Sequence, residues 1–410
     1  MFLVCFVNAR QLMYSGRMNN FYSILKDEID RLLPEIKELR KELHQFPETA
    51  WNEFETRKRL IKVLCDCKIN IHKPYLETDI VFDFGDPSQN EGLLLRSDMD
   101  ALSQVETGNK SYKSKNTGAA HNCGHDGHMS MLAGAALIID RLIKKGYPLP
   151  RPVRFVFQPA EEIECGGSKL VPAGILNNIK NVLAIHGWPQ LSKGQLFSKE
   201  GPFFAAAASF STEITGRATH GGLPQNGLSP FPSAAIMIKE IEEISSELKN
   251  KAIISSCRIN GGSSDNIIPD TIEISGTIRY YKQEHFDKIK KLFDAAGSKI
   301  KKETGCLVKT EYISKYYKPL SNSGEFLSDV NQILKEASSQ YQEIPAVISE
   351  TDAKTVSEDF AFYTDERPGA LILLGLGDET PSLHAADFDF PEEVLIQGIL
   401  LFVTTAYNLK

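Results

Sequence analysis

The stretch Val153-Arg-Phe-Val-Phe-Gln-Pro-Ala-Glu-Glu162 joins an almost continuous apolar run to two adjacent carboxylates. Short apolar runs of this kind are typical of strands that are buried on both faces of a parallel sheet. Three further runs share this character, at residues 92–96, 182–185 and 370–374. Helical segments such as residues 129–144 separate these runs. The alternation predicts an α/β domain with a mostly parallel sheet.

The composition is that of an ordinary globular protein, with 42% hydrophobic and 24% charged residues. At about 150 residues per domain, a chain of 410 residues predicts two or three domains. Lys and Arg number 46 and Asp and Glu number 53, which gives a formal net charge of −7. This acidic balance argues against nucleic acid or an anionic membrane surface as a partner.

The sequence carries no signal for a membrane span or for secretion. A transmembrane helix requires roughly 18 consecutive apolar residues, and the best stretch, residues 394–407, is interrupted by two threonines, a glutamine and a glycine. The apolar run at residues 1–7 is short, and no Lys or Arg precedes it. Seven cysteines without a disulfide-framework spacing favour a reduced, cytoplasmic protein.

The middle of the chain has a different character. Residues 209–215 and 271–281 alternate apolar and polar side chains, as half-buried strands do. Amphipathic helices are predicted beside them at residues 233–248 and 285–302. This combination predicts a separate, smaller α+β domain that is inserted at residues 202–313.

The α/β domain is expected to consist of the two segments on either side of this insert, residues 21–201 and 314–410. It begins with apolar residues at helical spacing, which predict an amphipathic helix over residues 22–45. Pro34 predicts a break or kink in that helix. Residues 1–20 are expected to be a loose N-terminal extension.

Metal-ligating and acid–base side chains follow each of the four predicted parallel strands. Ligands in open α/β sheets bind beyond the carboxyl ends of the strands, so four strands that each deliver a carboxylate or an imidazole predict one site. The residues concerned are Asp98, Asp100, Glu161, Glu162, His186 and, after a short loop, His384.

A fifth contribution comes from the segment His121-Asn-Cys-Gly-His-Asp-Gly-His128. Its two glycines allow a tight turn, and the helix that follows places it near a positive helix end. Cys123 and His125, together with the strand-end residues, offer a mixed sulfur, nitrogen and oxygen donor set that zinc-like metals accept. Six potential donors exceed the need of one tetrahedral ion, which favours two ions that share a bridging water.

Glu161 and Glu162 follow one strand directly, and adjacent side chains at a strand end point to opposite sides. One carboxylate can therefore ligate a metal while its neighbour stays free to act as a general base. Metal-assisted hydrolysis requires this division of roles.

Five motifs together resemble those of a known family. They are Arg96-Ser-Asp-Met-Asp100, the segment 121–128, Phe157-Gln-Pro-Ala-Glu-Glu162, Ser357-Glu-Asp-Phe360 and Ser382-Leu-His384. The chain resembles the dinuclear-metal aminoacylase and carboxypeptidase family over residues 35–405. The resemblance is greatest to its N-acyl-amino-acid amidohydrolases, which include hippurate hydrolases and plant auxin-conjugate hydrolases.

The resemblance implies a site with two divalent ions, zinc or manganese, with cobalt or nickel also possible. The implied ligands are Cys123, His125, Glu162, His186 and His384. It further implies that Glu161 is the general base and that Asp100 orients the metal site. Asp98 lies where more distant relatives carry a metal-binding His, which leaves its role open.

The insert carries three more residues that match family positions. His220 lies in a glycine-rich segment that resembles the one whose His reaches the active site of a partner subunit and stabilises the oxyanion. Asn266 and Arg279 resemble positions that hold the substrate carboxylate. The resemblance therefore implies a homodimer built through the insert, which would act as a lid and dimerisation domain.

Four other polar residues near these motifs keep an open interpretation. His121 and His128 are favoured as structural residues, because five ligands are already supplied. Glu358 and Asp359 match a family motif, but the sequence does not decide whether they contact metal, substrate or backbone.

These observations predict a cytoplasmic, homodimeric metallo-amidohydrolase that acts on a small N-acylated amino acid. A dipeptidase or a biosynthetic deacylase of the same family is the nearest alternative. A metal-free thiol hydrolase with Cys123 as nucleophile is a second one, and chelation separates the two mechanisms. A binding protein without activity is disfavoured, because the implied ligands and base are all present.

Overall fold

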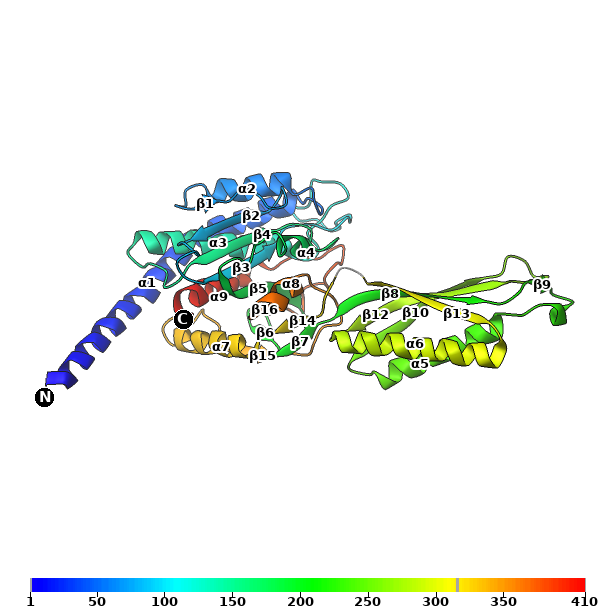
Figure 1. Ribbon diagram of the computed structural model, residues 1–410. Helices are drawn as coiled ribbons and strands as arrows, with labels where there is room; N and C mark the ends of the chain where they lie inside the picture. The colour runs from blue at the N-terminus through cyan, green and yellow to red at the C-terminus, as the bar shows by residue number, and fades with distance from the viewer. Residues whose placement is uncertain (1, 315–316, 410) are drawn as a thin grey trace. The chain divides into compact units, whose positions relative to one another are not determined.

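A computed structural model of the chain describes residues 2–314 and 317–409, with side chains for residues 20–313 and 317–409. Two compact units make up the chain (Figure 1). Unit 1 comprises Met1–Gly201, Asn322–Thr351 and Phe362–Lys410, and unit 2 comprises Pro202–Ser321 and Asp352–Ala361. The backbone of residues 2–20, which were expected to form a loose extension, is the first part of the helix α1 (Phe2–Gln45).

The core of unit 1 is an eight-stranded mixed sheet, and this confirms the predicted α/β class. Its strands, in spatial order, are β1 (Asn70–Ile71), β2 (Ile80–Phe84), β4 (Val153–Gln158), β3 (Gly92–Asp98), β5 (Ile179–Pro189), β16 (Gly369–Gly377), β6 (Leu196–Ser198) and β15 (Ile348–Glu350). The four strands expected from apolar runs are adjacent and mutually parallel, in the order β4-β3-β5-β16. β3 and β4 are buried along their whole length, as continuous apolar runs require.

The helices of unit 1 cover this sheet. They are α1 (Phe2–Gln45), α2 (Phe54–Leu64), α3 (His125–Lys144), α4 (Gly166–Leu170), α7 (Gly324–Ser338), α8 (Ala361–Glu366) and α9 (Leu395–Asn408), with the short 3₁₀ helix η2 (Glu392–Val394). α3 packs between α1 and α9 and is buried on nearly every side. Glycine permits this close packing, because a Cβ at Gly134 would lie 2.8 Å from Ile399 Cδ1.

α1 corrects one expectation, because it continues through Pro34 instead of breaking there. A proline inside a helix removes one backbone hydrogen bond. The residues on either side of it, Leu32 and Ile36, are buried in the core of unit 1. Tertiary packing of this apolar face outweighs the local cost of the proline.

Unit 2 is an antiparallel sheet covered on one face by two helices. The strand order is β10 (Ala252–Gly261), β12 (Thr271–Tyr280), β8 (Ala206–Thr215) and β13 (Leu307–Ser314). Figure 1 shows α5 (Phe231–Glu247) and α6 (Gln283–Thr304) along this sheet. Alternate strand residues such as Phe210 and Ile274 pack against them, which is the period of two read from the sequence.

Smaller elements complete the described chain. β9 (Thr219–His220) and β11 (Ile267–Ile268) form an antiparallel ribbon in unit 2, beside the 3₁₀ helix η1 (Pro224–Asn226). β7 (Gly201–Phe204) pairs with β14 (Leu320–Asn322).

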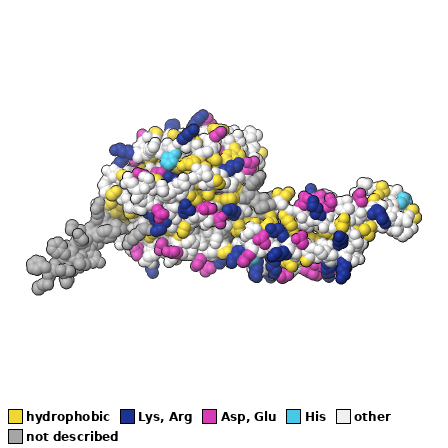
Figure 2. Space-filling view, in the orientation of Figure 1, with side chains coloured by type: hydrophobic (Ala, Val, Ile, Leu, Met, Phe, Trp, Pro, Cys, Tyr) yellow, Lys and Arg dark blue, Asp and Glu magenta, His cyan; other side chains and the backbone are white. Residues whose placement is uncertain are grey.

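Charges of both signs are interspersed over the face drawn in Figure 2, without a large region of one sign. This distribution agrees with the small formal charge and gives no basic track for nucleic acid on that face. Among the described residues, no helix combines the length and the apolar character that a membrane span requires.

Candidate metal centre

The carboxyl edge of the parallel strands gathers the side chains that the sequence singled out in unit 1. Asp98 is the last residue of β3, and it pairs in parallel register with Gln158, the last residue of β4. His186 lies within β5 and pairs with Leu373 of β16. Neighbouring parallel strands thus deliver their polar residues to one edge of the sheet, as open α/β sheets do.

The segment 121–124 forms a tight turn, and α3 begins directly after it at His125. Gly124 adopts φ +88°, a left-handed conformation that glycine reaches without a steric cost. A Cβ at Gly127 would lie 2.6 Å from the ring of Phe390, so this position also requires glycine. The two glycines let the segment pass close beneath Phe390, and this places Cys123 and His125 in the buried centre.

Two histidines of the centre are held with one ring nitrogen free to bind a ligand. His125 Nδ1 donates to the backbone oxygen of Asp100 at 2.8 Å, and His186 Nδ1 donates to the backbone oxygen of Gly187 at 2.8 Å. Because a carbonyl only accepts, each Nε2 keeps its lone pair. Cys123 Sγ lies 3.7 Å from His186 Nε2. Metal-ligating histidines commonly donate from one ring nitrogen in this way and bind the metal through the other, as His125 and His186 are placed to do.

Glu162 connects His125 with the more distant candidate ligand His384. Its Oε1 lies 3.2 Å from His384 Nε2 and 3.8 Å from His125 Nε2. One ligand atom each of Cys123, Glu162 and His384 lies within 4.8 Å of the other two. Among the described residues, His125 Nε2 is buried without a hydrogen-bond partner, and it faces the buried Glu162 Oε1 at 3.8 Å. A buried nitrogen without a partner that faces a carboxylate oxygen fits a bound cation between them.

The charge balance of the centre also favours a cation. Burial alone would lower the pKa of His125, but the nearby carboxylates of Asp98 and Asp100 outweigh it and raise this pKa to about 10. Burial raises the pKa of the Cys123 thiol well above its usual range, and the charges of Glu162 and Glu161 add to this effect. A bound cation would reverse both preferences, because metal ligation requires a neutral imidazole and a thiolate.

The raised pKa of Cys123 bears on the metal-free alternative. A thiol hydrolase needs a thiolate, and its cysteine therefore lies in electropositive surroundings. Cys123 is instead buried next to two carboxylates, which keep the thiol protonated. The geometry therefore favours metal ligation over nucleophilic attack for this residue.

Glu161 and Glu162 are placed by a turn, not by strand alternation as the sequence suggested. β4 ends at Gln158, and Ala160 then adopts a left-handed conformation with φ +57°. Both carboxylates consequently reach the same cluster, where one oxygen of each and one nitrogen of His125 lie within 4.8 Å of one another. Glu161 is 6% exposed, so its carboxylate lies in a nearly closed environment.

The carboxylate of Asp100 fixes this turn through two hydrogen bonds to its backbone. Its Oδ1 accepts from the backbone N–H of Glu161 at 2.9 Å, and its Oδ2 accepts from that of Glu162 at 3.0 Å. Its own backbone oxygen accepts from His125. Asp100 thus connects the two segments that carry the candidate base and two candidate ligands, as the resemblance implied for an orienting residue.

His128 and Asp98, whose roles the sequence left open, are joined to each other. His128 Nδ1 donates to Asp98 Oδ1 at 2.8 Å, and its Nε2 accepts from the backbone N–H of Gly187 at 2.8 Å. Both ring nitrogens of His128 thus take part in hydrogen bonds. Asp98 also accepts from Arg96 Nη1 at 3.0 Å. His121 is buried as well, and burial lowers its pKa to about 3.

The three predicted residues of the insert lie in unit 2. His220 is exposed on β9, where its Nδ1 accepts from the backbone N–H of Gly222 at 3.0 Å. Asn266 precedes β11, and its backbone oxygen accepts from the N–H of Gly221 at 2.7 Å, so it lies close to His220 on the ribbon. Arg279 is half-buried on β12, and burial lowers its pKa.

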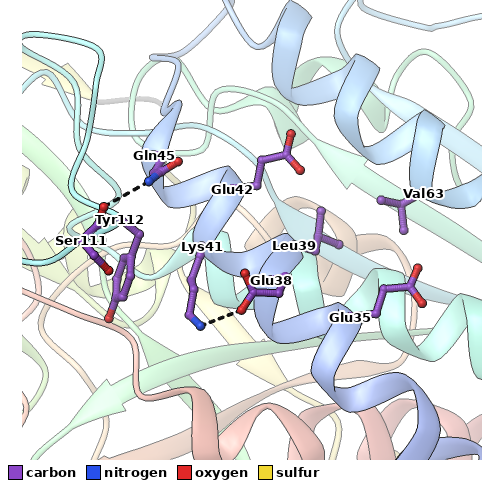
Figure 3. Close-up of a pocket in the computed structure, with 9 residues that line it drawn as sticks. All are labelled: Glu35, Glu38, Leu39, Lys41, Glu42, Gln45, Val63, Ser111 and Tyr112. Atoms are coloured by element: carbon purple, nitrogen blue, oxygen red, sulfur yellow. Dashed lines mark hydrogen bonds and ion pairs between the residues drawn. The ribbon is translucent and has the colours of Figure 1, made fainter.

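A separate pocket lies along α1 (Figure 3). It is lined by Glu35, Glu38, Leu39, Lys41, Glu42, Gln45, Val63, Ser111 and Tyr112. Lys41 Nζ donates to Glu38 Oε1 at 2.8 Å, and Gln45 Nε2 donates to the backbone oxygen of Ser111 at 3.3 Å. The pocket contains none of the predicted site residues and is not the candidate catalytic site.

Known proteins share the sequence segments that form this site. The profile of Peptidase family M20/M25/M40 matches residues 94–408, which include every candidate ligand described above. The chain belongs to this peptidase family. Family M20 hydrolases are metal-dependent peptidases and amidohydrolases, and this chain is a hydrolase of that kind.

Three relatives illustrate the range of this M20 family. N-acetyl-L-cysteine deacetylase of Bacillus subtilis is 32% identical over 90% of this chain and 87% of its own length. The IAA-amino acid hydrolase ILR1-like 4 of Arabidopsis thaliana is 30% identical over 90% of this chain and 84% of its own length. The crystal structure of the Bacillus subtilis YXEP protein, described as a dinuclear metal binding peptidase from the M20 family, is 27% identical with a TM-score of 0.79. It covers 92% of this chain and 98% of its own.

Sequence reasoning missed several buried groups that support the M20 centre. Arg40, His44 and Glu53 are fully buried polar residues of the first helix and of the loop that follows it. A charged residue is rarely buried unless it is paired, but the sequence gave no sign of burial at these three positions. Their partners lie far away in the sequence, 349 residues between Arg40 and Asp389, 82 between His44 and Asp126 and 107 between Glu53 and Ala160, and such pairs leave no local signal.

Proposed function

We propose that this M20-family chain hydrolyses the amide bond of N-acyl amino acids, of the hippurate or auxin-conjugate type, with Glu161 as general base. The observation that carries the proposal is the group formed by Glu161, Glu162 and His125, in which a carboxylate that can accept a proton adjoins two candidate ligands. The names of the N-acetyl-L-cysteine deacetylase and the IAA-amino acid hydrolase both describe a conjugated amino acid as the substrate, which supports this substrate class.

The residues that would hold two divalent ions are Cys123, His125, Glu162, His186 and His384. Their donor set of one sulfur, three imidazole nitrogens and a carboxylate suits zinc or manganese and tolerates cobalt or nickel. When bound, such ions polarise the amide carbonyl and lower the pKa of a water molecule.

The protein side chains then perform the proton transfers. Glu161 accepts a proton from the attacking water and passes it to the leaving amine nitrogen, so that the amide C–N bond breaks and a carboxylate and an amine are released. Asp100 keeps the backbone of Glu161 and Glu162 in place through its two hydrogen bonds. The nearly complete burial of Glu161 limits competing access of bulk water.

Unit 2 is proposed to supply the rest of the site and the dimer contact. His220 would stabilise the oxyanion in the active site of a partner subunit, and Asn266 and Arg279 would hold the substrate carboxylate. The exposure of His220 supports this, because a residue that serves a partner must be free to reach it. A location in the cytoplasm is supported by the cysteine spacing, which matches no disulfide framework.

Metal-dependent release of amine is the first expected result. Hippurate, N-acetyl-L-cysteine, indole-3-acetyl amino acids and simple dipeptides would be incubated with the enzyme, and the free amine would be measured before and after EDTA. We expect activity to disappear with EDTA and to return with Mn²⁺ or Zn²⁺, because the donor atoms are organised for a cation. Release that survives complete metal removal would contradict the mechanism. Cleavage of dipeptides alone would identify a dipeptidase.

A mixed-subunit experiment tests the role of His220 in a dimer. His220→Ala and Glu161→Ala chains are each expected to be nearly inactive. Mixed from unfolded chains in equal amounts, they should recover about a quarter of wild-type activity, because half of the dimers are mixed and each contains one intact site. A monomer in analytical ultracentrifugation, or a mixture without recovered activity, would contradict the shared site.

A further inference from the structure

Three consecutive backbone N–H groups in the turn after β4 donate to buried carboxylates. Those of Glu161 and Glu162 donate to Asp100, as described above. The N–H of Ala160 donates to Oε1 of Glu53 at 3.0 Å. Glu53 is fully buried, and its other oxygen accepts from the Thr78 hydroxyl at 3.0 Å. Two carboxylates from distant parts of the chain therefore hold one turn.

The conformation of Ala160 explains why the turn needs this support. Its φ of +57° lies in the left-handed region, which costs a residue with a Cβ roughly 1 kcal/mol or more. The turn is also fixed from its other side, where the N–H of Gly166 donates to the Ala160 oxygen at 2.9 Å. A Cβ at Gly166 would lie 1.9 Å from the Pro159 oxygen, so the two segments are in close contact. Such a conformation persists only where its surroundings fix it.

Glu53 occupies a position from which a side chain ordinarily caps a helix. It is the N-cap residue of α2, where a side-chain oxygen commonly accepts from the first free N–H groups. Its side chain makes no such bond and reaches Ala160, 107 residues away, instead. Glu48 takes over the start of α2, and accepts from the N–H of Thr56 at 2.6 Å and of Glu55 at 3.2 Å. The orientation of Glu53 is therefore not explained by the needs of its own helix.

We propose that Glu53 is a positioning residue of the hydrolytic site, which holds the turn at Ala160 so that Glu161 and Glu162 keep their places. The inference rests on the proposed role of Glu161 and adds to it a residue that acts through the backbone. It predicts that the hydrogen bond to Ala160, and not a charge, is the essential property of Glu53.

The raised pKa of Glu53 supports a role that depends on a hydrogen bond and not on a charge. Burial, with the charge of nearby Asp100, raises the pKa of Glu53 to about 7. The group is therefore partly neutral near neutral pH, and a neutral carboxyl still accepts through its carbonyl oxygen. Glutamine offers the same carbonyl at the same length, which makes Glu53→Gln a conservative replacement.

The test compares Glu53→Ala, Glu53→Gln and the control Glu48→Ala in Mn²⁺-saturated enzyme. Steady-state kinetics use the N-acyl amino acid of the panel that is cleaved fastest, and hydrogen exchange follows the amides of residues 158–164. For Glu53→Ala we expect kcat to fall by about 10- to 100-fold with KM within about 3-fold, since a loosened turn misplaces the base. The amide of Ala160 should exchange at least about 10-fold faster, because its acceptor is lost.

The two other variants separate positioning from general stability. Glu53→Gln should stay within about 3-fold of wild type in kcat and in exchange, because its amide carbonyl replaces the lost acceptor. Glu48→Ala should lower the melting temperature and leave both readouts of the turn unchanged, because the Glu48 side chain, which the variant removes, accepts from Glu55 and Thr56 of α2. Should Glu53→Ala not fold, Glu53→Asp, which withdraws the carboxylate by one methylene, is expected to give the same changes at smaller size.

The outcomes distinguish this inference from the proposed function. Wild-type kcat and exchange in Glu53→Ala would overturn it, as would equal losses in Glu48→Ala or in Glu53→Gln. Hydrogen exchange reports on the turn even if no substrate of the panel is cleaved, so the inference can hold while the proposed substrate class fails. Normal activity in Glu161→Gln would show that Glu161 is not the base, and the hydrogen-exchange result for the Glu53 variants would still stand.

Discussion

Glu161→Gln is expected to lower kcat by about 10²- to 10⁴-fold while the protein keeps its fold and its metal. Glutamine has nearly the shape of glutamate but cannot accept a proton at neutral pH. The turn should stay intact, because Asp100 binds the backbone N–H of residue 161 and not its side chain. The nearly buried position of Glu161 leaves little access for a water molecule to take its place as the base.

The variant would be assayed at saturating substrate, with bound metal counted by plasma mass spectrometry. Glu164→Gln is a matched control, since this carboxylate lies three residues further on in an exposed pair with Lys169 at 3.0 Å. The control should retain activity within about 2-fold, because exposed pairs contribute little. If Glu161→Gln kept normal turnover, another group would be the base. If it lost metal instead, Glu161 would be a ligand.

The strands and most helices follow from local patterns in the sequence. β3 and β4 were predicted because a strand buried on both faces must be apolar along its length, and both strands are. The helical segment expected at residues 129–144 is found within α3, which ends at the same residue, Lys144. Residues at strand ends could be located because parallel strands bring their ends to one edge.

The details of the centre depend on contacts that no local pattern records. The left-handed conformation of Ala160 is unusual for a residue with a Cβ, and alternation along β4 wrongly suggested that Glu161 and Glu162 point apart. Glu53 gave no signal, because its partner Ala160 is 107 residues away. The continuity of α1 through Pro34 could not be foreseen either, since it depends on tertiary packing.

A large loss of stability is expected when Arg40, which connects α1 to the segment that carries His125, is replaced. Arg40 is fully buried, its Nε lies 2.8 Å from Asp126 Oδ2, and its Nη2 donates to Asp389. Asp126 directly follows His125, and Asp389 lies in the loop after His384. Arg40 thus joins the two segments that carry candidate ligands. His44 adds a second contact, and its Nδ1 donates to Asp126 Oδ2 at 2.8 Å.

Arg40→Met should therefore lower the free energy of unfolding by about 3–5 kcal/mol, because it leaves the buried carboxylate of Asp126 without its arginine partner. Burial would lower the pKa of His44, but Asp126 and Glu106 outweigh it and raise this pKa. The hydrogen bond from His44 to Asp126 offsets only part of the loss. Methionine keeps most of the apolar stem and suits a helix interior, so the effect measures the ion pairs and not a cavity.

Urea unfolding followed by tryptophan fluorescence measures this cost, since both tryptophans, Trp51 and Trp188, lie in unit 1. Lys41→Met is the control from the next position of α1, where the exposed pair with Glu38 is drawn in Figure 3. It should cost less than about 1 kcal/mol. Adding Asp126→Asn to Arg40→Met should cost less than the sum of the single changes, because both remove the same pair. Additive costs would mean that Arg40 and Asp126 do not stabilise each other, and the connection between α1 and the ligand segment would then rest on packing alone.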